Sequence, residues 1–222
     1  MGERQTVSES KAIFHKEFPF VVPAVYRRLI DELIVELNLL SHQEDFEPDG
    51  MFSLGLTSIF NEFSKGYQPE TQKSKILPAI CKATGLSFQK IQDFSNNAKD
   101  LANKISIEEI KDASKGNKNK EEANLIKGII KVNNHYSRII AIGLFKFYEA
   151  MDVLKTSSQD DTLIRDLSSY IGIKKERFDK DVSIYKSNID KIEKALELIQ
   201  LNIKDEKRRS KEKKENQEAN TE

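Results

Sequence analysis

The sequence is poor in cysteine, because Cys81 is the only one among 222 residues. No disulfide can therefore form within the chain, and a reducing compartment is its simplest environment. Cys81 follows Ile80 directly and lies one helical turn after Leu77. A small apolar residue is expected at such a position, so we expect this thiol to pack in a core rather than to react.

The sequence also lacks net charge. It holds 36 Lys plus Arg residues and 36 Asp plus Glu residues, so the two signs cancel. Without a global field, nothing draws the whole protein toward nucleic acid or an anionic membrane. The basic cluster at 207–214 is interleaved with glutamates and has no aromatic stacking platform. Nucleic acid is therefore not an expected partner.

Long apolar runs are missing too. The longest, Ile139–Phe145, is far shorter than the roughly 20 residues that cross a bilayer. Any membrane contact is therefore expected to be peripheral. The first residues show neither the apolar stretch of a signal peptide nor the Arg-rich, acid-poor composition of a transit peptide, which favours a mature or a bacterial cytoplasmic protein.

Motifs typical of metal, nucleotide or acyl chemistry are absent from the sequence. The three histidines, His15, His42 and His135, are far apart, and none has a second ligand at helical spacing. Adjacent carboxylates such as Asp160 and Asp161 point in different directions or lie in solvent. The sequence therefore predicts no enzymatic activity, no cofactor, no metal site and no small-molecule substrate.

Apolar residues recur every three or four positions along nearly the whole chain, which predicts an all-α, multi-helix bundle. Local signals place the helix ends: Thr6 and Glu9 form a capping box, Pro19 and Pro23 interrupt the chain, and Gly66 and Gly85 follow apolar stretches. The expected helices cover about 6–18, 23–40, 52–63, 69–84, 88–101, 106–114 and 121–154, the last as one continuous helix.

Two glycines lie inside apolar helical stretches, Gly55 and Gly143. A glycine there costs about 1 kcal/mol relative to alanine, so a packing reason is expected. The two helices could cross closely at these residues, or the glycines could be unrelated. The sequence leaves both possibilities open.

The clearest periodicity lies near the C-terminus, where apolar residues alternate at spacings of four and three. A straight helix cannot keep such a 3.5-residue repeat on one face, which predicts a coiled-coil strand. The alternative is an ordinary amphipathic helix docked on the bundle, and the seam does not say whether its partner is the same chain, a second copy or another protein. The seam consists of Phe178, Val182, Tyr185, Ile189, Ile192, Leu196, Ile199 and Ile203.

We therefore expect three parts. A helical bundle domain covers 1–172, an amphipathic coiled-coil helix covers 173–203, and a charged tail without fixed structure covers 204–222. On the bundle, the polar face of the helix at 23–40 offers Arg27, Arg28 and Glu32 as candidate partner-binding residues.

Several stretches carry a resemblance to a known family. They are Thr6–Lys11 with Phe18–Pro19, Val25–Leu37 with Phe52–Leu56, Tyr136–Leu144, and Tyr185–Lys191. In this order they resemble the thylakoid formation protein family, also called the photosystem II biogenesis protein family, of cyanobacteria and chloroplasts. The resemblance covers nearly the whole chain, and without a transit peptide a cyanobacterial member is expected.

The resemblance implies an all-helical auxiliary protein without catalytic residues, needed for photosystem II assembly or repair and for thylakoid organisation. Its implied partners are the FtsH protease complex, photosystem II subunits, or both. The implied location is peripheral, on the cytoplasmic side of the thylakoid membrane, with a further soluble cytoplasmic pool. The alternative is a self-associating coiled-coil protein that organises thylakoid membranes.

Overall fold

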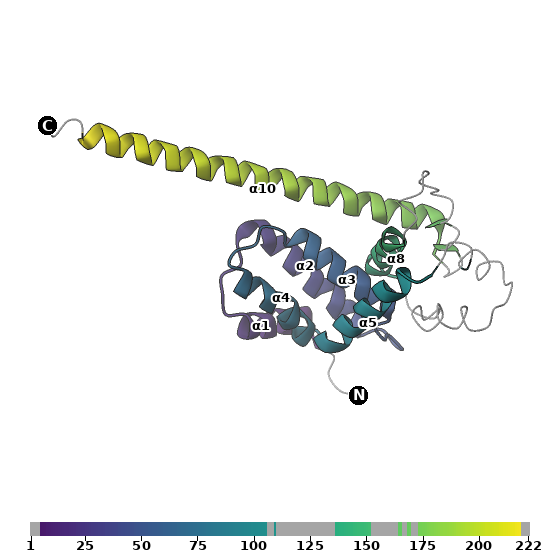
Figure 1. The fold of residues 1–222 in the computed structure, drawn as a ribbon. Helices are drawn as coiled ribbons and strands as arrows, with labels where there is room; N and C mark the ends of the chain where they lie inside the picture. Colours follow the sequence, from purple (N-terminus) through teal and green to yellow (C-terminus); the bar gives the residue numbers. More distant parts are fainter. Residues whose placement is uncertain are drawn as a thin grey trace. The chain divides into compact units, whose positions relative to one another are not determined.

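The computed structural model describes residues 5–105, 109, 136–151, 164–165, 168–169 and 173–218. Every regular element in these ranges is a helix, which confirms the predicted all-α class (Figure 1). The predicted helix at 106–114, apart from Glu109, and His135 lie outside the described residues.

Helix α1 spans Val7–Glu17 and begins where the capping box was predicted. The Thr6 hydroxyl accepts a hydrogen bond from the Glu9 amide at 3.2 Å, and the Glu9 carboxylate accepts one from the Thr6 amide at 2.6 Å. Two of the unpaired amides at the helix start are thus satisfied, which fixes the first turn.

A proline, a glycine or a polar cap residue marks at least one end of each of the next four helices. Helices α2, Ala24–Ser41, and α4, Glu70–Ala83, each start directly after a proline, while the Asp49 and Ser87 side chains cap α3, Gly50–Phe63, and α5, Phe88–Ala102. Gly66 and Gly85 have φ of 74° and 75°, the left-handed region that glycine tolerates best after a helix end. Helix α1 packs against α2 and α4, and α3 packs against α5 (Figure 1).

The closest helix crossing joins α3 to α8, Arg138–Ala150, through the two glycines. A Cβ on Gly55 would lie 1.9 Å from the Ile139 carbonyl oxygen, and a Cβ on Gly143 would lie 1.8 Å from the Met51 carbonyl oxygen. The helix backbones therefore touch directly. Of the two possibilities that the sequence left open, the structure thus shows the close crossing, which explains why glycine occupies both positions.

The prediction of one continuous helix over 121–154 is wrong. Helix α8 starts only at Arg138, because Ser137 adopts an extended conformation and its hydroxyl caps the Ile140 amide at 3.3 Å. At the other end, Met151 has a ψ of 139° and leaves the helix. Apolar periodicity carries no information about such a cap, so the predicted helix extended past the observed boundary.

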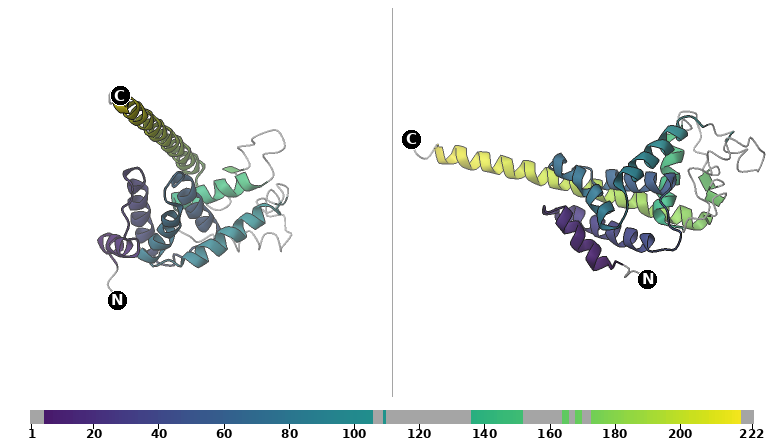
Figure 2. Two further views of the ribbon diagram at one scale, coloured as in Figure 1. Left: turned by 60° about the vertical axis from the view of Figure 1, so that its left-hand side comes forward. Right: turned by 90° about the horizontal axis from the view of Figure 1, so that it is seen from below.

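Helix α10 spans Lys175–Glu218, but the chain divides into two compact units between Tyr185 and Lys186. All the buried core residues that the structure describes lie in the first unit, and the last of them along the chain are Phe178, Val182 and Tyr185 of α10. Figure 2 shows α1 at the edge of this unit. The boundaries predicted at 172 and 203 stay a prediction, and the structure describes 204–218 as helix.

Cys81 lies in the core of the first unit, fully buried. Burial raises the pKa of its thiol to about 12, because a thiolate would lose its hydration there. The reactive thiolate is therefore strongly disfavoured, in agreement with the expected packing role.

Candidate partner-binding surfaces

The outer face of α2 carries the three predicted partner-binding residues, and the structure separates them into two groups. Arg28 Nε lies 2.8 Å from Glu32 Oε1, one turn further along the helix. Glu32 also lies 3.8 Å from Arg138 Nη2, at the start of α8. Arg28 and Glu32 therefore belong to an ion-pair network within the chain, while Arg27 stands outside it.

Glu36 is the buried end of this network. Its carboxylate accepts a hydrogen bond from Arg138 Nε at 2.6 Å, and its side chain is only 17% exposed. Burial raises the pKa of the Glu36 carboxyl, and the Arg138 guanidinium offsets part of that effect. The pair joins α2 to α8 across 102 residues of sequence.

A second polar contact holds the start of α10 to the residues before α8. The Tyr136 hydroxyl donates a hydrogen bond to Asp181, and the Arg177 guanidinium lies 4.0 Å above the centre of the Tyr136 ring. Burial and the Asp181 carboxylate both raise the pKa of Tyr136, so its hydroxyl stays a donor. These contacts belong to the first unit and fix the first turns of α10.

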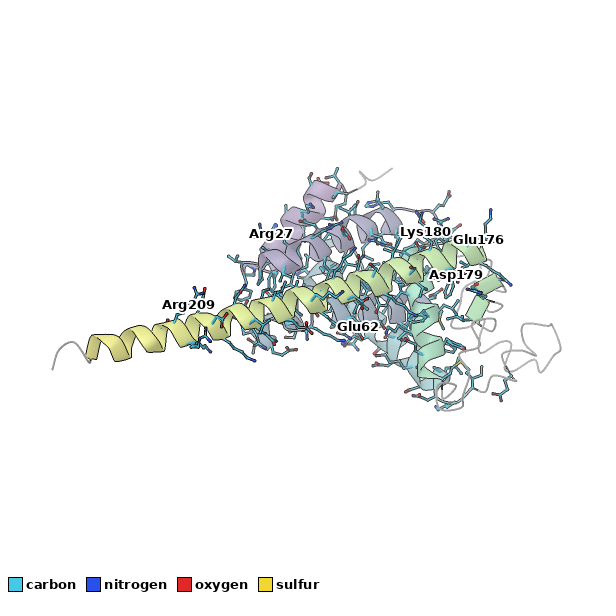
Figure 3. All side chains as sticks on the ribbon, turned by 90° about the horizontal axis from the view of Figure 1, so that it is seen from above. Arg27, Glu62, Glu176, Asp179, Lys180 and Arg209 are labelled. Atoms are coloured by element: carbon cyan, nitrogen blue, oxygen red, sulfur yellow. The ribbon has the colours of Figure 1, made fainter. Side chains whose placement is uncertain are left out.

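Arg27, labelled in Figure 3, lines a groove of about 540 Å³ that the sequence did not predict. The end of α1, the segment 19–22 and the first half of α2 enclose it. Its floor is apolar and buried, and two apolar residues of the segment, Phe20 and Val21, remain exposed. The floor residues are Phe14, Phe18, Ile30 and Ile34.

One sequence signal could have found this groove. The stretch Phe18–Pro23 reads Phe-Pro-Phe-Val-Val-Pro, and its two prolines exclude a continuous helix. Four large apolar residues in a non-helical segment need a neighbouring surface, which here is the side of α2. Only the tertiary approach of α1 and α2 completes the groove.

The predicted seam is divided between the two units. In the first unit Phe178, Val182 and Tyr185 are buried, and the Tyr185 ring packs edge-on against Phe63 at 5.7 Å. In the second unit Ile199 and Ile203 are exposed. Leu198 and Leu201, outside the seam, are also exposed, at 62% and 57%. The first seam residues thus pack in the core, while Ile199 and Ile203 leave apolar surface exposed.

No helix in the part of the chain that the structure describes has the length and hydropathy to cross a membrane. Among the same residues, no three His, Cys, Asp or Glu side chains gather closely enough to hold a metal ion.

Comparison with known proteins covers nearly the whole chain. A family model described as thylakoid formation protein matches residues 6–214. Protein Thf1 of Prochlorococcus marinus strain MIT 9211 is 56% identical over 214 residues, which are 96% of each chain. Protein Thf1 of Prochlorococcus marinus strain NATL1A is 42% identical over 207 residues, covering 92% of this chain and 99% of the relative.

A solved structure of Psb29 shares the fold, with a TM-score of 0.78 at 27% identity. The similarity covers 92% of this chain and 98% of that one. Sequence and fold thus agree over most of the chain, and the chain belongs to the thylakoid formation protein family, which is associated with thylakoid formation and photosystem II biogenesis.

Proposed function

We propose that this protein is a non-enzymatic auxiliary factor for photosystem II assembly or repair that acts by binding other proteins. The observation that carries the proposal is the match to the thylakoid formation family over residues 6–214. The proposed partners are the thylakoid FtsH protease complex and photosystem II subunits. The proposed location is peripheral, on the cytoplasmic side of the thylakoid membrane.

The second unit supports a role in binding. Its helix is rich in charge, yet Leu198, Ile199, Leu201 and Ile203 expose large apolar side chains within two turns. Clustered apolar side chains on an exposed helix are typical of a surface that a partner helix covers. The seam residues Ile189, Ile192, Leu196, Ile199 and Ile203 are therefore the proposed contacts of this unit.

The test is co-purification of a tagged chain from solubilised thylakoid membranes. We expect the FtsH protease, photosystem II subunits, or both to be recovered with the wild type and lost with a double variant, Ile199→Lys and Ile203→Lys. A control with Gln200→Lys and Asn202→Lys adds the same charge at neighbouring polar positions and should keep the partners. Recovery of neither partner by the wild type would refute the proposal.

The same exposed seam also supports a second candidate, a coiled-coil protein that self-associates and organises membranes. Light scattering of the purified wild type and of the double seam variant separates the two. Self-association requires a dimer or larger assembly in the wild type that the variant loses. A strict monomer in both samples would dismiss this candidate.

A further inference from the structure

The segment between α1 and α2 leaves backbone groups unpaired beside the apolar groove. Phe18 and Val22 each precede a proline, which disfavours helical backbone at both residues. Within the described residues, the amides of Phe20, Val21 and Val22 donate to no other backbone group. A chain bound along this segment could therefore form main-chain hydrogen bonds with it.

The groove offers an apolar surface for side chains of such a chain. Its floor of phenylalanine and isoleucine is almost fully buried, whereas Val21 on its edge is 83% exposed and Phe20 is 37% exposed. An apolar concavity bordered by exposed apolar side chains is typical of a peptide-binding surface. It would accept one or two large aliphatic or aromatic side chains.

The charged side chains at the edge of the groove favour a partner with a negative charge. Arg27 Nη2 makes one long hydrogen bond, 3.4 Å to the Val22 carbonyl oxygen, and has no carboxylate partner within 4.0 Å among the described residues. The carboxylate that lines the groove, Asp31, is already held by Lys11 at 2.8 Å. The Lys75 ammonium lies 5.5 Å from the centre of the Phe20 ring. The uncompensated charge is thus positive, and a guanidinium pairs best with a carboxylate.

From these contacts we propose that the groove binds an extended segment of a partner protein that carries large apolar side chains and an acidic side chain. The apolar side chains enter the groove, and the carboxylate pairs with Arg27. This inference rests on the proposed function only in taking the ligand to be another protein. It adds a binding surface in the first unit that is separate from the seam.

The test places the photo-crosslinking residue p-benzoylphenylalanine at Val21 of the full-length chain, in thylakoid membranes. The crosslinked peptide is then identified by mass spectrometry. We expect a segment of a partner protein with large apolar residues and an Asp or Glu within a few positions. The same residue at Leu39, which is 59% exposed on α2 and does not line the groove, is the matched control and should not capture that segment.

Arg27 variants test the charge. Arg27→Glu should lower the yield of the Val21 crosslink by about tenfold or more, whereas Arg27→Lys should retain most of it, because only the first reverses the charge. Far-ultraviolet circular dichroism checks that both variants keep their helices.

Several outcomes would overturn the inference. They are a crosslink to lipid or to a second copy of this chain, a crosslinked segment without a carboxylate, equal yields from Arg27→Glu and the wild type, and no crosslink at Val21. If co-purification of the FtsH protease or photosystem subunits persists in these cases, the groove is refuted while the proposed function stands. If the crosslink and the co-purification were both lost, the groove and the proposed function would both be refuted.

Discussion

At the scale of single residues, Gly55 and Gly143 have the strictest environment in the described core. Each glycine faces a carbonyl oxygen of the opposite helix backbone, which cannot rotate away as a flexible side chain would. The contact is therefore set by two backbones, and neither position tolerates a Cβ unless α3 and α8 separate.

We expect Gly55→Ala to lower the free energy of unfolding by about 3 kcal/mol, the upper end of the 1–3 kcal/mol that overpacking commonly costs, because the added Cβ would meet a backbone carbonyl oxygen. Urea denaturation followed by circular dichroism measures the change. Gly85→Ala is the control, since a Cβ there meets nothing within 4 Å and only the positive φ resists it. It should cost about 1–2 kcal/mol. Equal losses in the two variants would contradict a steric origin.

Glu36 gives the chain a pH-dependent contribution to stability. Its pKa is raised in the folded state above its ordinary value of 4.5, so the folded chain holds this proton more tightly than the unfolded chain. The contribution is complete below the unfolded pKa and is lost as pH rises through the folded pKa. The free energy of unfolding of Glu36→Gln, minus that of the wild type, should therefore increase from pH 4.5 upward. Urea denaturation across this range measures it.

Glu9 supplies a control of opposite sign. Hydrogen bonds from the Thr6 backbone and side chain lower the pKa of its carboxyl, so its contribution is present above the unfolded pKa and is lost as pH falls. The free energy of unfolding of Glu9→Gln, minus that of the wild type, should therefore decrease as pH rises. If this difference changed with pH in the same direction for Glu36→Gln and Glu9→Gln, the two carboxylates would not be the cause of the pH dependence.

At the scale of helices, the boundary of α8 depends on one hydroxyl. Ser137 is buried and extended, and its hydroxyl accepts a hydrogen bond from the Ile140 amide at 3.3 Å, while the Ser137 carbonyl oxygen accepts from the same amide at 3.1 Å. Ser137→Ala should cost about 1 kcal/mol of stability, the usual loss of a helix cap, as measured by thermal or urea denaturation. Ser137→Thr, which keeps the hydroxyl, should retain most of it. If Ser137→Ala left the stability unchanged, this role of the serine hydroxyl would be contradicted.

Sequence patterns predicted the helices from α1 to α5 because residues close in sequence to each helix end determine where that helix ends. Thr6 with Glu9, the prolines, and the glycines at 66 and 85 act within a few residues of the boundary. The start of α8 was missed because the apolar periodicity continues across Ser137, although serine is a preferred helix cap. The pairing of Glu36 with Arg138 could not be predicted either, because the fold alone brings α2 to α8.

The candidate surfaces were predicted less completely than the helices. Arg27, Arg28 and Glu32 look alike in sequence, as charged residues on one polar face, yet two of them pair within the chain and one lies beside a groove. The groove itself is made by three segments, and its neighbour Val21 carries no motif. Which polar residues remain available to a partner is thus a property of the tertiary structure.

At the scale of the whole molecule, a single helix serves two units. The residues of α10 up to Tyr185 belong to the buried core, whereas the apolar residues from Leu198 to Ile203 are exposed. The seam repeats with one period across both units, so its period cannot show where the core ends. Among the described residues of this helix, Tyr185 is the last buried one along the chain.

Two truncated chains test this division. A chain of residues 1–185 should keep the free energy of unfolding of the full chain to within about 1 kcal/mol, because none of the residues after Tyr185 whose burial the structure describes is part of the core. A chain of residues 1–174 loses Phe178, Val182 and Tyr185, each worth about 1.5–3 kcal/mol when buried, and also the Asp181 partner of Tyr136. It should unfold at much lower urea concentration or fail to fold. Equal stability of the two truncated chains would place the end of the core near 172 and would show that the first turns of α10 are dispensable.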